Sequence, residues 1–388
     1  MNANLDYSKE DESAILARAM SLIGKSFKDI SNLSQNPQSE LNIKNKGNAG
    51  NFIEQHWFGI KNNSTPEPDF TEAEIELKAC PLRLSNQTLV VKERTKICSI
   101  NYLNLINESW DKSHAKRKLN KVLFVFYEYN NNNWQEQKII DTALWKLSLN
   151  ELIIESEWVK TKQTVVDGLA HNLTERGYKV LSPCRSGSGG VDAQGKHKDL
   201  VKQPNSEDLA LKRAFSLKRP FVNQYWESLK NPERFESISD TLDLSRGDNL
   251  EQELLDKIGK YVGKTIGEIS KELNILIPSA KNAIPVIINK IIGFQGAKSK
   301  IKEFEQVGIL IKTIPIRMID LKLYEAVSFP AIKFLEFEKE EWCNSLLSEQ
   351  LTRIFFIPVS RDKSSGVDVK DRTLEKPFFG LLADLKKE

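Results

Sequence analysis

A stretch of the first half of the chain recurs in the second half, and this repeat constrains the fold more than any other feature. Residues 302–316 read KEFEQVGILIKTIPI and align without gaps on residues 68–82, which read PDFTEAEIELKACPL. The identical pairs include Phe70 and Phe304, Ile75 and Ile309, Lys78 and Lys312, and Pro81 and Pro315. Further matches flank both segments in the same order: Gly24 and Lys25 with Gly263 and Lys264, and Trp110, Ser113 and Leu119 with Trp342, Ser345 and Leu351. Collinear matches indicate an internal duplication, so we expect one fold to occur twice.

The spacing of apolar residues predicts helices around a few strands. Residues 13–31, 51–60 and 150–177 have the period of helices. Apolar and charged residues alternate from residue 73 to residue 79, which predicts a half-buried strand. Residues 121–129 form a more continuously apolar run, typical of a buried strand. This mixture predicts an α/β or α+β fold.

A polar stretch poor in aliphatic residues, 231–250, predicts a linker between two domains. The first domain is then 1–230 and the second is 251–388. The alignment brings the end of the second domain to the counterpart of Ser156. We therefore expect the second copy to be shortened at its C-terminus and to lack the equivalent of 157–226.

Composition favours a globular, cytoplasmic protein with no membrane partner. No apolar run reaches the length of a membrane span, and the N-terminus lacks the order of a signal peptide. The four cysteines and four histidines show no metal-ligand spacing, so we interpret the cysteines as reduced structural thiols. The net charge of +3 does not by itself indicate a nucleic-acid partner. Two basic clusters, 112–121 and 211–220, are on composition alone more typical of solvated helix faces.

The alternating strand carries charges at a spacing that suits phosphodiester hydrolysis. Glu76 and Lys78 are two residues apart and share one face, and Asp69 ends the preceding turn. Two carboxylates can hold a hard cation such as Mg²⁺, and a neighbouring lysine can orient or deprotonate water and offset phosphate charge. The alternative is a surface ion pair on an exposed strand.

The two copies differ where this chemistry would need charge. The differing pairs are Glu54 and Ile288, Asp69 and Glu303, Glu76 and Leu310, and Lys118 and Gln350. Most shared positions are apolar or turn-forming. A surface ion pair does not predict this pattern, whereas a fold with one active and one inactive copy does.

Four segments in order resemble the MutH-like GATC endonucleases, a branch of the PD-(D/E)xK nucleases. They read GNFIEQHWFG, PDFTEAEIELKACPL, WDKSHAKRKLNKVLF and KRAFSLKRPF, and the resemblance covers about residues 13–226. It implies an α/β, restriction-endonuclease-like core with a mixed central sheet flanked by helices, present as two tandem copies. It also implies a Mg²⁺ cofactor. The implied catalytic residues are Glu54, Asp69 and Glu76 as metal-binding acids, Lys78 as the motif lysine, and Lys118 as the second lysine.

The duplicated layout resembles the larger type II restriction enzymes of this family, in which an inactive copy serves DNA binding. The resemblance thus implies a Mg²⁺-dependent restriction endonuclease acting on double-stranded DNA at GATC, as a monomer with a pseudo-dimeric pair of domains, alone or dimerising on DNA. One alternative is a methyl-directed mismatch-repair nicking enzyme, and another is a non-catalytic DNA-binding protein that retains the fold.

DNA contacts are expected from the loop 185–199 and the second basic cluster. The candidate residues are Arg185, Lys212, Arg213, Ser216, Lys218 and Arg219. Ser216 stands where the repair enzyme has a tyrosine that helps to distinguish methylated from unmethylated adenine. We therefore expect sensitivity to adenine methylation to be reduced.

Overall fold

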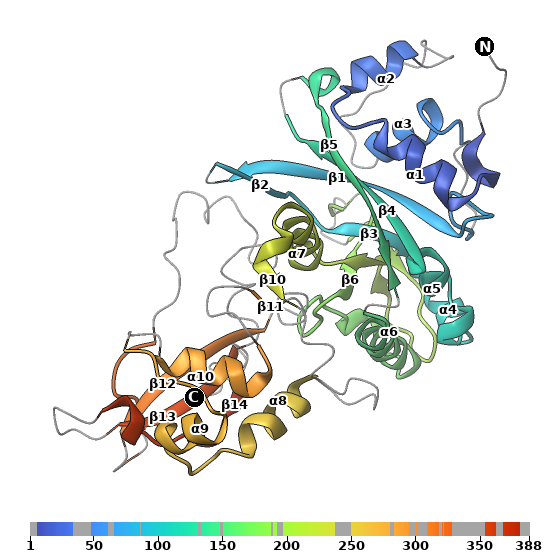
Figure 1. The fold of residues 1–388 in the computed structure, drawn as a ribbon. Helices are drawn as coiled ribbons and strands as arrows, with labels where there is room; N and C mark the ends of the chain where they lie inside the picture. Colours follow the sequence, from blue (N-terminus) through green and yellow to red (C-terminus); the bar gives the residue numbers. More distant parts are fainter. Residues whose placement is uncertain are drawn as a thin grey trace. The chain divides into compact units, whose positions relative to one another are not determined.

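The computed structural model describes residues 6–33, 48–60, 66–85, 87–130, 133–147, 150–187, 189–191, 197–236, 250–279, 283–294, 300–301, 309–317, 320, 322–327, 354–361 and 368–380. The chain divides into two compact units, Met1–Asn223 and Gln224–Glu388. We refer to these as the first and second units and describe each by itself (Figure 1).

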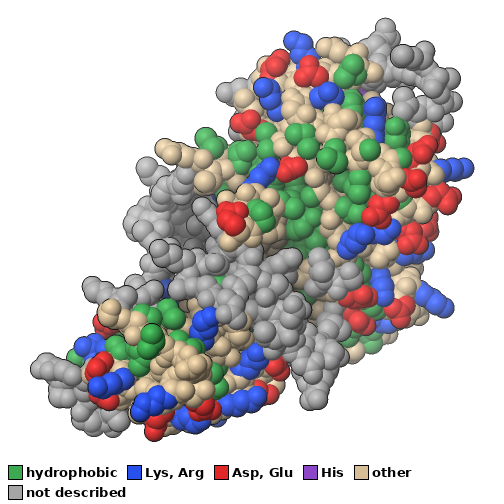
Figure 2. Space-filling view, in the orientation of Figure 1, with side chains coloured by type: hydrophobic (Ala, Val, Ile, Leu, Met, Phe, Trp, Pro, Cys, Tyr) green, Lys and Arg blue, Asp and Glu red, His purple; other side chains and the backbone are tan. Residues whose placement is uncertain are grey.

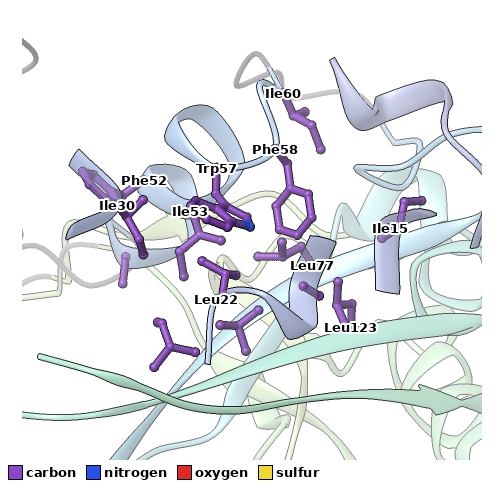
Figure 3. Packing of buried hydrophobic residues seen from close by; sticks show 14 of the residues in the cluster. Ile15, Leu22, Ile30, Phe52, Ile53, Trp57, Phe58, Ile60, Leu77 and Leu123 are labelled. Carbon is purple, nitrogen blue, oxygen red and sulfur yellow. The ribbon is translucent and has the colours of Figure 1, made fainter. Parts of the chain in front are cut away.

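The first unit is built on a mixed sheet with the strand order β2-β1-β4-β5. Its strands are β1 (Ile75–Ser85), β2 (Thr88–Val91), β4 (Lys121–Glu128) and β5 (Ile139–Lys146). Strands β1 and β4 are parallel, while β2 and β5 pair antiparallel at the edges. Helices α1 (Glu12–Met20), α2 (Phe27–Leu33) and α3 (Asn48–His56) lie together on one side of this sheet (Figure 1). They bury aromatic and aliphatic side chains against β1 and β4, where Leu77 and Leu123 complete the core (Figure 3).

A second sheet of the first unit has the strand order β3-β9-β6, and all its pairs are antiparallel. Its strands are β3 (Thr95–Ser99), β6 (Leu181–Arg185) and β9 (Arg213–Leu217). The short strands β7 (Leu200–Val201) and β8 (Ala210–Leu211) form a separate pair. Helices α4 (Tyr102–Leu105), α5 (His114–Leu119) and α6 (Glu151–Val166) belong to this part, and α7 (Arg219–Lys230) follows β9 directly.

The second unit has three helices and a three-stranded sheet among its described residues. The helices are α8 (Leu250–Gly259), α9 (Ile266–Glu272) and α10 (Ala283–Ile292). The sheet has the order β12-β13-β14, with β12 (Leu310–Arg317) parallel to β13 (Ile354–Arg361) and β14 (Phe378–Gly380) antiparallel to it. A further parallel pair joins β10 (Phe235–Glu236) to β11 (Lys300–Ile301). Isoleucines of α9 and α10 pack with Phe355 and Ile357 of β13 in one core.

Aligned residues of the two units occupy the same positions in their sheets. Glu76 pairs with Val122 in the first unit, and their aligned counterparts Leu310 and Ile354 pair in the second. The turns agree as well, as Gly24 and Gly263 have φ of 83° and 81°. The N–H of Gly24 donates to the carbonyl of Ile139, and the N–H of Gly263 donates to the carbonyl of Leu374, each over 2.8 Å.

The structure refines the expected element bounds. The helical stretch 13–31 is interrupted by a turn that contains Gly24, and the helix expected to run to residue 177 ends at Val166. Strand β1 begins at Ile75 rather than at residue 73, because Glu74 has a φ of 55°, which is incompatible with a strand.

The border between the units lies within α7. Most of the polar stretch, 237–249, lies outside the described residues, so a linker over 231–250 stays a prediction.

Two expectations from composition can be compared with the structure. No helix in the described ranges is both long and apolar enough to span a bilayer. Cys80, Cys98 and Cys184 are buried and free, as expected for structural thiols, and Cys343 lies outside the described residues. On the face shown in Figure 2, Lys and Arg mix with Asp and Glu among the described residues.

Candidate active site

Glu76 is the centre of a buried cluster of charges on β1. Its side chain is 2% exposed and contacts two lysines. Lys78 Nζ donates to Glu76 Oε1 over 2.6 Å, and Lys118 Nζ lies 2.9 Å from each carboxylate oxygen of Glu76. Lys78 is two residues along the same strand, so the contact confirms that both side chains project from one face. Lys118 reaches the cluster from α5, a helix whose N-cap is Ser113.

Asp69 bends back toward β1 from the preceding turn. Backbone hydrogen bonds between Phe70 and Ile75, of 2.9 and 3.1 Å, close this turn. They place Asp69 so that its Oδ2 accepts the N–H of Leu77 over 2.9 Å. Burial raises the pKa of Asp69, and the negative charge of Glu76 raises it further. The expected grouping of Asp69 with Glu76 and Lys78 is therefore present.

Glu54 extends from α3 toward the same cluster. Burial and the charge of Asp69 together raise its pKa to about 7. Burial lowers the pKa of Lys78, but the nearby charges of Glu76 and Asp69 outweigh this and leave its pKa raised. The structure thus brings together all five predicted catalytic residues, with raised pKa values for Glu54 and Asp69 that disfavour their anions and a raised pKa for Lys78 that favours its cation.

The oxygen-rich donor set suits a hard divalent cation. No three His, Cys, Asp or Glu side chains form a ready metal site within the described ranges. In this structure the two lysines supply the positive charge beside Glu76, and Asp69 uses one oxygen for the N–H of Leu77. The raised pKa values of Glu54 and Asp69 arise partly from neighbouring carboxylates, and a cation between these groups would relieve that repulsion. Glu54, Asp69 and Glu76 therefore fit such an ion by their chemistry.

The first basic cluster is mostly engaged within the protein. Lys116 pairs with Asp111 and Glu151, each at 2.7 Å, and Arg117 pairs with Glu67 at 3.1 Å. Lys118 belongs to the charge cluster around Glu76. Neighbouring basic residues in the sequence thus have different roles, and Lys112 is exposed.

The six predicted DNA-contact residues separate into exposed and inward-facing positions. Arg185 and Lys212 are exposed. The side chain of Arg213 is buried and donates to the carbonyls of Pro183 and Leu173, which gives it a structural role in this conformation. Lys218 donates to the carbonyl of Tyr178 over 2.9 Å, and Arg219 is buried.

Ser216 also faces inward. It is fully buried on β9, and its Oγ lies 2.7 Å from Cys184 Sγ. Its neighbour across the sheet is Lys96 of β3, which is exposed and donates to Ser186 Oγ over 3.3 Å. Lys96 gives no signal in the sequence, because it is a single lysine outside both basic clusters. Only the pairing of β3 with β9 brings it next to the predicted DNA-contact region.

The second unit lacks an equivalent cluster at its described positions. Ile288, aligned with Glu54, is 1% exposed within the core, and Leu310, aligned with Glu76, is half-buried. Lys312 is present on β12. The other two aligned positions, Glu303 and Gln350, lie outside the described residues.

We expect the stability of the metal-free protein to fall as the pH rises through about 7, because of Glu54. Its folded-state pKa of about 7 lies above the ordinary value of 4.5, so the folded chain keeps a proton that the unfolded chain loses. This contribution is complete below about pH 4.5 and is lost as the pH passes about 7, with a size on the order of 1–3 kcal/mol. Glu54→Gln should flatten the profile measured by urea unfolding in EDTA.

The exposed Glu72 provides the matched control, because Glu72→Gln makes the same chemical change outside the cluster. That variant should keep the slope of the parent protein between pH 5 and pH 8. An unchanged slope in Glu54→Gln would show that Glu54 does not hold the proton.

This chain is similar in sequence to DNA mismatch repair and restriction enzymes. The family model described as DNA mismatch repair enzyme MutH matches two segments, residues 58–157 and 293–384. The type II restriction enzyme Sau3AI of Staphylococcus aureus is 29% identical over 379 residues, which cover 92% of this chain and 73% of that enzyme. The DNA mismatch repair protein MutH of Pectobacterium atrosepticum is 26% identical over 217 residues, covering 55% of this chain and 90% of that protein. MutH of Vibrio vulnificus is 28% identical over 170 residues, covering 43% of this chain and 73% of that protein.

The family match and these relatives place the chain among nucleases of the PD-(D/E)xK type, a class that generally uses a divalent metal. Within that class, the chain belongs to the MutH-like endonucleases. Membership implies the restriction-endonuclease-like core expected from the sequence.

Proposed function

We propose that this chain is a type II restriction endonuclease that hydrolyses both strands of duplex DNA at GATC with Mg²⁺. The observation that carries the proposal is the intact cluster in which Glu76 meets Lys78 and Lys118 beside Asp69 and Glu54. The length of the alignment with a restriction enzyme favours a restriction enzyme over a repair enzyme. The similarity to Sau3AI spans 92% of the chain, whereas that to MutH of Pectobacterium atrosepticum spans 55%.

Each residue of the cluster has a role that follows from its surroundings. Glu54, Asp69 and Glu76 would hold Mg²⁺, which when bound supplies positive charge at the scissile phosphate and favours ionisation of water. Lys78 remains charged because two acids face it, so its ammonium group can orient the attacking water and offset charge on the phosphate. Lys118, on helix α5, holds the Glu76 carboxylate in place through hydrogen bonds to both of its oxygens.

DNA contact is assigned first to the exposed cations near the second sheet. Arg185, Lys212 and Lys96 are exposed there. Contacts to phosphates hold the register of the protein, and contacts to base edges carry the sequence information. Arg213 and Ser216 contact residues of the sheet and its surroundings from inside, Arg219 is buried, and Lys218 donates to the carbonyl of Tyr178.

The second unit is proposed to be a degenerate copy of the first that binds DNA without cutting it. The matching register of Glu76 with Val122 and of Leu310 with Ile354 supports a common origin. A tethered second DNA-binding unit raises the local concentration of the catalytic unit at its target. The chain would then act as a monomer with a pseudo-dimeric pair of domains.

Sequencing the ends of a plasmid digest tests the proposal. Linear products with ends at GATC, formed with Mg²⁺ and prevented by EDTA, are expected. Open-circular product that never becomes linear would instead identify the nicking activity of a repair enzyme. Tight binding without any cleavage, in Mg²⁺ or in Mn²⁺, would identify a non-catalytic DNA-binding protein.

Adenine methylation at the target is expected to have little effect on cleavage. Ser216 occupies the position that the family resemblance assigns to a discriminating tyrosine, and it is buried against Cys184. Neither a ring nor a hydroxyl from this position reaches out to meet an adenine methyl group. Initial rates on fully methylated and unmethylated plasmid should agree within a few-fold. A block by methylation would assign the discrimination to another residue.

A further inference from the structure

Two short segments, one of which contains Gly187, Gly189 and Gly190, form an antiparallel arm beside the second sheet. We call residues 185–187, 189–191 and 197–199 the arm. Val191 and His197 form an antiparallel bridge, and the N–H of Lys198 donates to the carbonyl of Gly190 over 3.3 Å. At the base of the arm, the N–H of Lys212 donates to the carbonyl of Asp199 over 2.7 Å. The arm is therefore hydrogen-bonded internally and anchored to the residue that precedes β9.

Asp199 holds the two sides of the arm together. It is 6% exposed, and its Oδ2 accepts the N–H of Gly189 over 2.6 Å. Its carboxylate also fills the space in which residue 187 would carry a side chain. A Cβ on Gly187 would lie 2.5 Å from Asp199 Cγ, and the φ of Gly187 is +118°. The contact thus requires glycine at 187, for space and for backbone conformation alike.

The charges of the arm are arranged with the acid inside and the cations outside. Arg185, Lys198 and Lys212 are exposed, whereas the carboxylate of Asp199 is turned toward the backbone. Arg185 Nη2 lies 3.1 Å from His197 Nδ1, a contact that ties the exposed guanidinium group to the second side of the arm. Lys96 donates to Ser186 Oγ from the neighbouring β3. The exposed surface of the arm suits a polyanion.

The arm lies close to the catalytic cluster through β3. That strand carries Lys96 beside the arm and Cys98 two residues further on. Burial raises the pKa of the Cys98 thiol to about 12, and the charges of Lys118 and Glu76 also act on it. Helix α5, which provides Lys118, packs against β3. DNA bound at the cluster would therefore come within reach of the arm.

We propose that Asp199 is a positioning residue for DNA recognition, which holds the arm in the conformation that reads the sequence. This inference rests on the proposed function. Base contacts demand closely defined side-chain positions, whereas phosphate attraction tolerates movement. An arm that is already ordered before binding also avoids the entropy cost of becoming ordered on the target DNA sequence. Loss of the Asp199 contact should therefore weaken sequence discrimination more than overall DNA affinity.

The test measures discrimination by the full chain with Ca²⁺ replacing Mg²⁺. Fluorescence anisotropy gives the Kd for a duplex with GATC and for the same duplex with the site scrambled. Asp199→Ala and Gly187→Ala are each expected to reduce the ratio of the two affinities at least tenfold, with the scrambled-duplex Kd unchanged within threefold. Asp199→Asn keeps the size and an acceptor for the N–H of Gly189, so it should retain most of the ratio.

Gly24→Ala is the matched control for Gly187→Ala. Gly24 also has a positive φ, +83°, but a Cβ there would have no atom within 4 Å, and the residue lies outside the arm. This variant places a side chain at a positive φ without touching Asp199 and should keep the ratio of the parent protein.

Two failures can be told apart. If the unmodified chain shows no preference for GATC, the proposed function fails and this inference fails with it. If the unmodified chain discriminates and both Asp199→Ala and Gly187→Ala, folded by their melting curves, discriminate equally well, only the role of Asp199 is overturned.

Discussion

Alanine at Glu76 or at Lys78 is expected to abolish DNA cleavage by the full chain while DNA binding largely persists. Glu76 is the acid that contacts both lysines, and Lys78 is the cation favoured by two neighbouring carboxylates. Loss of charge stabilisation of this kind lowers rates by roughly a hundredfold to a thousandfold. The measurement is the rate of plasmid cleavage in Mg²⁺ at saturating enzyme, with the Kd for a GATC duplex measured alongside.

The two variants differ in their expected effect on stability, which provides a check on interpretation. Glu76→Ala leaves Lys78 and Lys118, 19% and 12% exposed, without their carboxylate, and breaking a buried pair costs about 3–5 kcal/mol. Lys78→Ala leaves Glu76 paired with Lys118, so the loss should be smaller. The exposed Lys112 supplies the control, because Lys112→Ala should retain activity. Mg²⁺-dependent cutting by folded Glu76→Ala would place the active site elsewhere, in the second unit or on another strand.

Acids restored to the second unit are not expected to restore cutting. The experiment introduces Ile288→Glu and Leu310→Glu together into the full chain that already carries Glu76→Ala. Ile288 is 1% exposed among apolar neighbours in the core around α9, α10 and β13. A carboxylate there must be buried without a designed partner, which is expected to destabilise the unit by several kcal/mol. The position aligned with Lys118 is also Gln350.

Each substitution made alone shows how much that added carboxylate destabilises the second unit. Leu310 is half-buried, so Leu310→Glu should change stability by only about 1 kcal/mol. Leu276 is 92% exposed, and Leu276→Glu is the control for adding a carboxylate to this unit without burial. Urea unfolding followed by circular dichroism measures each change. Recovery of GATC cleavage in the triple variant would mean that the second unit retains a usable site.

The sequence predicts the grouping of Glu76 and Lys78 because its signal is local. Glu76 and Lys78 lie two apart on one strand, and an alternating pattern is sufficient to place them on one face. Lys118 is distant in the sequence. The repeat marks it as a charge that the second copy lacks, and the family resemblance assigns its role. The repeat also aligned residues that hold equal positions in their sheets, as the pairs Glu76–Val122 and Leu310–Ile354 show.

The roles of basic residues near the second sheet could not be read from the sequence. Arg213 belongs to a cluster that suggests DNA contact, yet it is buried and donates to backbone carbonyls. Burial of an arginine depends on which carbonyls surround it, and these come from segments far away in the chain. Asp199 was missed for a similar reason, since its partners Gly187 and Gly189 are defined by the backbone path of the arm.

The two units have the same strand register although only the first carries Glu76, which separates the requirements of the fold from those of the proposed chemistry. The ladder between β12 and β13 forms with Leu310 where β1 has Glu76, so the ladder does not depend on the catalytic charges. Ile288 extends the apolar core of the second unit at the position where Glu54 is held with a pKa near 7. In the first unit, activity would require Glu54 to remain beside Asp69, although burial and the charge of Asp69 raise the pKa of Glu54. The second unit, proposed not to cut, carries an apolar residue at the same position and keeps the same strand register, so this architecture does not itself require the acid.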